Sequence, residues 1–373
     1  MSQAPLLAAK RLVVKIGSAL LVDLEGQVRM HWLATLAADV AALRQHGIEV
    51  ILVSSGSIAV GQTLLGLPKR RLYLEEKQAA AAAGQIRLAN VYATAMAAHG
   101  IAVAQILLTL EDTEARRRHL NARATINQLL KLGALPVVNE NDTIATTEIR
   151  IGDNDRLAAR VGVMINADTL VLLSDIDGLY TADPRLDPAA KHIPEVVRLT
   201  PEIVAMGGKA LPGLSSGGME TKLLAGRMAA EGGCRMAIAN GRQMHALAHL
   251  AEGGKATWFA AATEPMTARK RWIKAALDPR GRLHLDRGAV AALSRGKSLL
   301  PAGVTATEGT FRRGDLLLLL GPDGAEVGHG LSAYGNDEAE RILGRQSKEI
   351  EEILGYRGRE ELIHRDDLVL SGN

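Results

Sequence analysis

Two short segments combine glycine and lysine in a way that suits phosphate binding. Residues 216–222 read Ser-Gly-Gly-Met-Glu-Thr-Lys, a glycine pair followed by a predicted helix that carries Lys222. Glycine lets the backbone approach an anion closely, and the first turn of a helix presents unpaired N–H groups to it. Residues 12–14 form an apolar run that leads into Lys15 and Gly17. Together the segments predict one polyphosphate held between two lysines.

Each segment alone is also compatible with an ordinary strand-to-helix turn, in which glycine closes the turn and lysine faces solvent. Neither segment is a P-loop. The Gly-Lys-Ser at residues 296–298 has Ala291 where that motif needs its first glycine. No Gly-x-Gly-x-x-Gly follows the first predicted strand, so a dinucleotide-binding fold has no support.

Polar side chains cluster where predicted strands end. Residues 139–142 read Asn-Glu-Asn-Asp and residues 152–155 read Gly-Asp-Asn-Asp, with further polar groups at residues 54–57 and 174–175. Ligands of parallel sheets bind beyond the carboxyl ends of the strands. Carboxylates accept from an ammonium and amides donate to a carboxylate, so these residues favour an amino-acid pocket. A pair of Asx turns is the alternative, because Asn and Asp are common in loops.

Other site chemistries have less support. Residues 153–155 and 175–178 lack the full spacing of an EF-hand loop, although magnesium carried by a nucleotide remains open. His245 and His249 stand four apart on a predicted helix, but Ala246 replaces the glutamate of a zinc protease. No combination of Ser, His and Asp stands out as a nucleophilic arrangement in the first part of the chain. We therefore predict direct phosphoryl transfer, in which the protein positions reactants and neutralises charge.

The elements that position these residues follow from the hydrophobic pattern. From residue 10 to about 255, short apolar runs alternate with amphipathic or alanine-rich stretches. This pattern predicts an α/β fold with three layers, a mainly parallel sheet covered by helices on both faces. The predicted strands are residues 12–16, 49–53, 101–107, 135–138, 169–174 and 235–239. The clearest predicted helices are residues 31–45, 77–99 and 121–132.

The character of the chain changes at residues 253–280, where glycines, prolines and a run of positive charge indicate a linker. Beyond it, short strands are predicted at residues 282–285, 316–320 and 326–330, which indicates a small β-barrel or sandwich. Two helices are predicted to follow, at residues 338–343 and 347–354.

Composition limits the class of protein. The 373 residues predict two or three domains, and 47% apolar with 23% charged residues is typical of a globular protein with a core. A net charge of +3 is too small to indicate nucleic acid or membrane partners. The single cysteine, Cys234, excludes an internal disulfide and fits a reducing compartment. The first ten residues lack a leader pattern, and residues 316–320 fall far short of the ~20 that a span needs. We expect a cytoplasmic protein.

Taken in order, these motifs resemble the glutamate 5-kinase family, an amino-acid kinase domain followed by a PUA domain. The resemblance covers nearly the whole chain. It implies a kinase domain over residues 1–262, a linker at 263–279, a PUA β-barrel over 280–358 and a tail at 359–373. The chain departs slightly at Ser174, where threonine is common, and at residues 215–216, but both places keep small polar groups. The segments that carry the resemblance are residues 13–18, 54–56, 138–142, 152–155, 178–185 and 217–222.

The resemblance also implies a site. Catalysis would rest on Lys15 and Lys222, with Asp155 orienting both lysines. The γ-carboxylate of glutamate would attack the γ-phosphate of ATP in line, without a general base because it is already an anion, to give L-glutamyl 5-phosphate for proline biosynthesis. L-glutamate would contact Ser55, Asp142, Asp153 and Asn154. ATP, carrying Mg²⁺, would bind through Lys15, Ser174, Asp175, Ser216, Gly217, Gly218, Met219, Glu220, Thr221 and Lys222.

Two alternatives stay open. Another amino-acid kinase, acting on acetylglutamate, aspartate, carbamate or UMP, would share much of this pattern. PUA domains often bind RNA, and residues 269–313 hold eleven Lys or Arg against three acidic residues. Residues 263–373 as a whole hold 17 of each sign, so we do not expect RNA as a partner. The resemblance further implies proline as feedback inhibitor, a homodimer or tetramer, a possible glutamyl-phosphate reductase partner and no membrane association.

Overall fold

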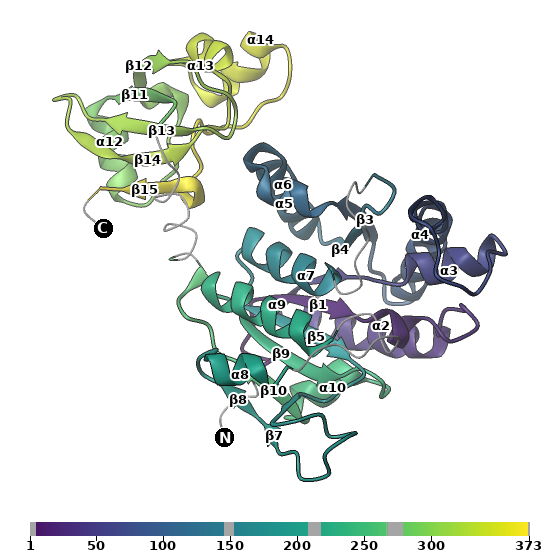
Figure 1. The fold of residues 1–373 in the computed structure, drawn as a ribbon. Coiled ribbons are helices and arrows are strands. Elements are labelled where there is room, and N and C mark those ends of the chain that lie inside the picture. Colours follow the sequence, from purple (N-terminus) through teal and green to yellow (C-terminus); the bar gives the residue numbers. More distant parts are fainter. Residues whose placement is uncertain (1–4, 145–152, 208–217, 266, 268–278, 372–373) are drawn as a thin grey trace. The chain divides into compact units, whose positions relative to one another are not determined.

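The computed structural model describes residues 5–144, 153–207, 218–265, 267 and 279–371. The chain divides into two compact units, Met1–Glu114 with Ala122–Pro265, and Ala115–Asn121 with Met266–Asn373. Each unit is built around its own sheet (Figure 1). Most of the linker expected at residues 263–279 lies outside the described residues, and the domain limits stay a prediction.

An eight-stranded sheet forms the centre of the first unit, with the strand order β3-β4-β2-β1-β5-β9-β10-β8. Its strand pairs are parallel except β9 with β10, which run antiparallel. The predicted mainly parallel sheet is therefore confirmed. The strands are β1 (Arg11–Ile16), β2 (Glu49–Val53), β3 (Val103–Leu108), β4 (Leu135–Glu140), β5 (Thr169–Ser174), β8 (Glu195–Val196), β9 (Arg235–Asn240) and β10 (Ala256–Phe259), and a separate pair is formed by β6 (Leu179–Tyr180) and β7 (His192–Ile193).

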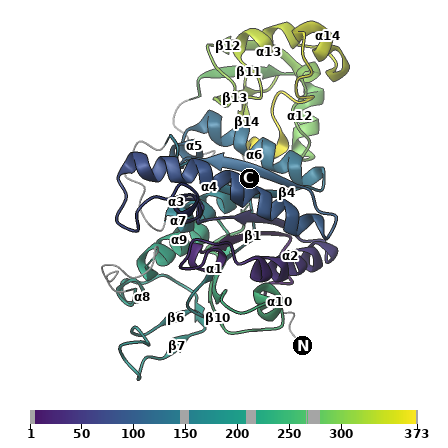
Figure 2. The ribbon, with the colours of Figure 1, turned by 90° about the vertical axis from the view of Figure 1, so that its right-hand side faces the viewer.

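Helices cover the sheet on both faces and give the three layers that the sequence predicts (Figures 1 and 2). On one face the core includes α2 and α4, and on the other it includes α7 and α9. The helices are α1 (Ser18–Leu21), α2 (Met30–Gln45), α3 (Ser57–Leu64), α4 (Leu74–Ala97), α5 (Leu110–Glu114), α6 (Arg116–Lys131), α7 (Asp153–Met164), α8 (Pro201–Ala205), α9 (Met219–Glu231) and α10 (Ala246–Ala251).

Strand alternation decides which face receives the lysine of β1. Leu12, Val14 and Ile16 pack into the core with α2, whereas Val13 packs into the core with α7 and α9. Successive side chains of a strand point to opposite faces, so Lys15 shares the face of Val13. The side chain at the end of this strand is therefore delivered to α7 and α9.

Two interpretations of the sequence are wrong. The linker expected from residue 253 begins too early, because β10 lies within it and pairs with β9. In β10, Ala256, Thr257 and Phe259 are buried. This strand is too short to be recognised in the sequence beside the nearby glycines. The Asx turns considered as an alternative are not formed at residues 153–155, which are instead the first turn of α7, where Asp and Asn are favoured by the unpaired N–H groups of a helix start.

The second unit contains a five-stranded sheet with the order β12-β11-β13-β14-β15. Within the segment expected as a tail, residues 359–373, β15 belongs to this sheet and pairs with β14. Leu362 and Ile363 are fully buried, so this segment completes the core of the unit. The elements are β11 (Gly281–Leu285), β12 (Val304–Gly309), β13 (Leu316–Leu320), β14 (Glu326–Leu331), β15 (Leu368–Leu370), α12 (Arg287–Ser294), α13 (Asn336–Ile342), α14 (Ile350–Leu354) and the 3₁₀ turns η1 (Pro301–Gly303), η2 (Ser347–Glu349) and η3 (Arg365–Asp367).

Candidate functional site

Two lysines from distant parts of the sequence meet at one carboxylate. Lys15 Nζ lies 2.8 Å from Asp155 Oδ1, and Lys222 Nζ lies 3.2 Å from Asp155 Oδ2. Asp155 is fully buried, and the two lysines are 7% and 5% exposed. The convergence expected from the sequence is thus present in the structure. The cluster carries two positive charges and one negative charge in a place nearly closed to water.

Helices α7 and α9 hold this cluster beside the end of β1, and they lie side by side in Figure 1. Asp155 is on the first turn of α7, and Lys222 is on the first turn of α9, after Gly218 at the N-cap. Thr221 adds a third contact, because its Oγ1 lies 3.0 Å from Asp155 Oδ2. The start of α9 is therefore fastened to α7 by polar contacts at the point where a phosphate would approach the helix.

The two lysines keep the carboxyl group of Asp155 ionised. Burial alone would raise the pKa of Asp155, but the positive charges of Lys15 and Lys222, with their hydrogen bonds, outweigh burial and lower that pKa below its usual value. An ionised Asp155 offsets one of the two positive charges. A net charge of about +1 is then left to face an incoming anion.

A second polar group lies at the ends of β2 and β4. Asn154 Nδ2 donates to Ser55 Oγ at 2.9 Å and to Asn139 Oδ1 at 3.3 Å. Ser57 Oγ, at the start of α3, donates to Asp142 Oδ2 at 3.2 Å. Ser55, Ser57, Asn139 and Asp142 are all buried. The predicted contacts Ser55, Asp142 and Asn154 are thus brought to one edge of the sheet.

This polar group adjoins the lysine cluster because Asn154 and Asp155 are neighbours on α7. Gly56, between the two serines, has φ of 98°, a left-handed conformation that strongly favours glycine. It turns the chain sharply from β2 into α3, so that Ser55 and Ser57 both remain near the edge. The strand-end geometry places this polar group directly beside two cations.

The structure describes only some of the residues that are expected to contact ATP. Ser174 is buried at the end of β5, and its Oγ lies 3.2 Å from Oδ1 of the exposed Asp175. Gly218, Met219 and Glu220 form the start of α9. Ser216 and Gly217 lie outside the described residues, as does the side chain of Asp153. The roles assigned to these residues stay predictions.

Sequence reasoning did not single out Gln85, and it included Asn139 only within the polar segment 139–142 and not among the expected substrate contacts. Gln85 Oε1 accepts from Asn139 Nδ2 at 3.1 Å, which joins α4 to the polar group at the strand ends. A glutamine in a long alanine-rich helix carries no distinctive spacing. For Asn139 a signal was present, because it is the last-but-one residue of β4 and opens the Asn-Glu-Asn-Asp segment.

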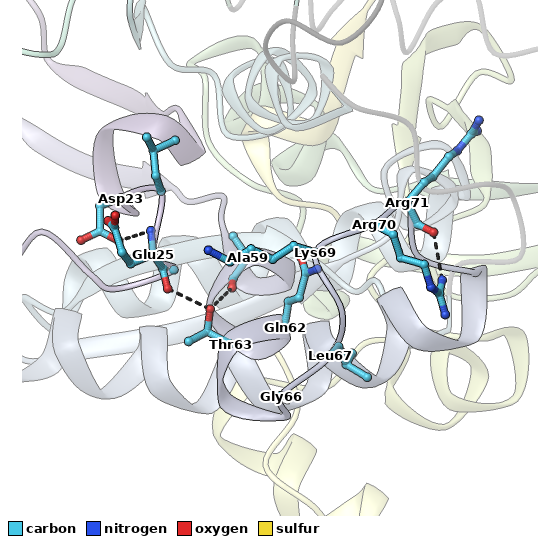
Figure 3. A pocket seen from close by; sticks show the side chains of 12 residues that line it. Asp23, Glu25, Ala59, Gln62, Thr63, Gly66, Leu67, Lys69, Arg70 and Arg71 are labelled. Atoms are coloured by element: carbon cyan, nitrogen blue, oxygen red, sulfur yellow. Dashed lines mark hydrogen bonds between the residues drawn. The ribbon is translucent and has the colours of Figure 1, made fainter.

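A cavity of about 650 Å³ lies elsewhere in the first unit, and none of the predicted site residues line it (Figure 3). Its positive side chains do not converge. Arg70 donates to both oxygens of Glu76, at 2.9 and 2.7 Å, and Asp23 accepts from the N–H groups of Glu25 and Gln27. The side chains of Arg70 and Asp23 are thus satisfied within the protein, and we assign the cavity no part in the chemistry.

A metal ion held directly by the protein would need several metal-binding side chains close together. Across the described ranges, no group of three or more His, Cys, Asp or Glu side chains is arranged to hold one. Asp155, the carboxylate nearest the two lysines, is already engaged by both of them.

Comparisons with known proteins identify the family of each part of the chain. Residues 10–240 match the amino acid kinase family, and residues 281–354 match the PUA domain. A glutamate 5-kinase from Paramagnetospirillum magneticum is 61% identical over 99% of this chain and 100% of its own length. Glutamate 5-kinases from Rhodospirillum rubrum and Agrobacterium fabrum are 60% and 56% identical over 96% and 100% of this chain, and each is covered over 96% of its own length.

Proposed function

The chain belongs to the amino acid kinase family, and on that premise we propose that it transfers the γ-phosphoryl group of ATP to the γ-carboxylate of L-glutamate. The product is L-glutamyl 5-phosphate, the first intermediate of proline biosynthesis. The observation that carries the proposal is the meeting of Lys15 and Lys222 at Asp155, beside the polar pocket of Ser55, Asp142 and Asn154.

The chemistry requires two anions to approach one another, and the lysine cluster reduces their repulsion. Lys15 and Lys222 lie on opposite oxygens of one carboxylate, so their positions are fixed before the substrates arrive. Prearranged charges cost no reorganisation during the reaction, which makes them effective in stabilising a transition state. The attacking carboxylate is already ionised near neutral pH and needs no general base.

The start of α9 supports the phosphates. Its first N–H groups point away from the helix toward the segment of Gly218, and the helix dipole adds partial positive charge there. Mg²⁺, when bound on the nucleotide, supplies further neutralisation of phosphate charge. The protein's own part is to hold the two reactants in line and to limit access of water.

The pocket at the ends of β2 and β4 suits an amino acid. Asp142 provides negative charge for an ammonium, while the Ser55 hydroxyl and nearby backbone N–H groups donate to a carboxylate. Assignment of L-glutamate, among amino acids with a second carboxyl group, rests on the relatives named above.

Several further features belong to the same proposal. We place the reaction in the cytoplasm, and every described helix is too short or too polar to cross a bilayer. Inhibition by proline, assembly into a dimer or tetramer and delivery of the acyl phosphate to a reductase remain predictions. RNA binding by the PUA domain is not part of the proposal.

A hydroxamate assay tests the substrate assignment. The protein is incubated with ATP, Mg²⁺ and hydroxylamine, together with L-glutamate, acetylglutamate or aspartate. Hydroxylamine traps an acyl phosphate as a coloured hydroxamate. We expect colour with L-glutamate alone; colour with acetylglutamate or aspartate but not with L-glutamate overturns the proposal.

A further inference from the structure

We propose that Gln85, on α4, is a positioning residue that fixes the amide of Asn154 toward the amino-acid substrate through Asn139. The inference rests on the proposed function, since it concerns the same pocket. Gln85 is 8% exposed, and it accepts from Asn139 Nδ2 at 3.1 Å. Asn139 in turn accepts from Asn154 Nδ2 at 3.3 Å.

A backbone group sets the direction of every hydrogen bond in this chain of amides. The N–H of Glu140 donates to Asn139 Oδ1 at 2.9 Å, and a backbone N–H can only donate. The other end of the Asn139 amide must therefore be its NH₂ group, which donates to Gln85 Oε1. Asn139 is thus held at both ends, by the Glu140 N–H on one side and by Gln85 on the other.

The same logic orients Asn154. Because Asn139 presents an oxygen, Asn154 must turn its NH₂ group toward it, and the second hydrogen of that group reaches Ser55 Oγ at 2.9 Å. The carbonyl oxygen of Asn154 is then directed away from Asn139 and Ser55. In the described part of the chain, this buried oxygen has no hydrogen-bond partner. It is an acceptor ready for the ammonium group of an amino acid.

Gln85 itself shows a feature that stability alone does not explain. Its Nε2 atom is buried, and no partner for it occurs among the described residues. A buried donor without a partner is costly, and native proteins contain few of them. Its acceptor oxygen, by contrast, has a partner, since it accepts from Asn139 Nδ2.

Close packing of two helices keeps Gln85 in place. A Cβ atom added to Gly84, the preceding residue, would lie 1.8 Å from the carbonyl oxygen of Ser57, and one added to Gly61 would lie 1.7 Å from that of Ala80. Helices α3 and α4 therefore touch backbone to backbone, and they lie together in Figure 2. The position of Gln85 is coupled to the start of α3, which carries Ser57.

The test compares Gln85→Met with Gln85→Glu. Methionine has a similar length and no acceptor for Asn139, so we expect the KM for L-glutamate to rise roughly tenfold, as for loss of one buried hydrogen bond. The KM for ATP should change less than twofold. Glutamate at position 85 still accepts from Asn139, and we expect it to keep the L-glutamate KM within about threefold of wild type.

Two further measurements separate positioning from a purely structural role. In an Asn139→Ala background, Gln85→Met should add no further rise in KM, because its effect passes through Asn139. The melting temperature of Gln85→Met should stay near that of wild type, because the substitution removes the unpaired donor Gln85 Nε2 and leaves the donor Asn139 Nδ2 unpaired in its place. Asn90→Leu, which removes an exposed amide from the same helix, is the matched control and should change neither KM.

The outcomes are distinguishable. If wild-type protein forms no glutamate hydroxamate, the proposed function fails. If wild type is active but Gln85→Met leaves the L-glutamate KM unchanged, or raises both KM values equally, the role of Gln85 is refuted. Additive effects of the Gln85 and Asn139 substitutions also refute it. Should Gln85→Met fail to fold, a tenfold rise of the L-glutamate KM in Gln85→Glu contradicts the proposal.

Discussion

Replacement of Lys222 by alanine tests the electrostatic role of the lysine cluster most directly. The ammonium group of Lys222 lies 3.2 Å from Asp155 Oδ2 and is nearly buried, so its position is fixed and poorly screened by solvent. At about 4 Å from a transferring phosphoryl group, with an effective dielectric constant of about 20, one positive charge contributes about 4 kcal/mol. At about 1.4 kcal/mol per tenfold change in rate, Lys222→Ala should lower kcat by up to about a thousandfold.

The assay is the initial rate of hydroxamate formation at saturating ATP and L-glutamate, measured on the purified full chain. Arg227→Ala is the matched control, because Arg227 lies on the exposed face of the same helix and carries the same charge. Circular dichroism and melting curves for both variants check that the fold is retained. A kcat for Lys222→Ala within about threefold of the control refutes the assignment of Lys222 to the reaction.

Three other variants probe stability. The pKa of Asp155 is lowered in the folded protein, so its ionised form stabilises the fold above the ordinary carboxyl value of about 3.9, and this contribution is lost as pH falls through the folded pKa. Asp155→Asn should therefore unfold about 3 kcal/mol more easily than wild type at pH 7, with the gap closing below about pH 4 in urea titrations; a gap independent of pH contradicts this. Gly61→Ala should destabilise by about 1–3 kcal/mol, because its Cβ would collide with Ala80. Gly162→Ala, on α7 with only ordinary contacts at 3.8 Å or more, should stabilise by up to about 1 kcal/mol, and equal melting temperatures for both glycine variants would argue against the packing explanation.

The parallel sheet could be predicted because its strands are buried on both faces and read as continuous apolar runs. The same reasoning placed Lys15 at the end of β1, and strand alternation then accounts for the face on which it lies. The pairing of Lys15 with Lys222 depends on 206 intervening residues that no local pattern describes. That pairing came from two similar phosphate-binding segments and was supported by the family resemblance.

The parts that could not be predicted are those in which local signals conflict with tertiary packing. Strand β10 has four residues beside a glycine pair and a proline, so composition alone suggested a linker. Strand β15 has three residues near the end of the chain, and only its pairing with β14 reveals that it belongs to the sheet. Such short strands are stabilised by neighbours far away in the sequence rather than by their own propensity.

The role of Gln85 lies beyond sequence reasoning for a different reason. The direction of an amide depends on which group donates to it, and here that information originates in the N–H of Glu140, which every residue other than proline possesses. This donor determines the orientation of the Asn139 amide, which in turn determines the orientation of the Gln85 amide on one side and of the Asn154 amide on the other. Asp155, the next residue on α7, is oriented by charge rather than by hydrogen-bond direction. The start of α7 therefore carries both an amide oriented by hydrogen bonds for the amino acid and a carboxylate that holds the two lysines for the phosphate. A shift of α7 should disturb binding of both substrates together.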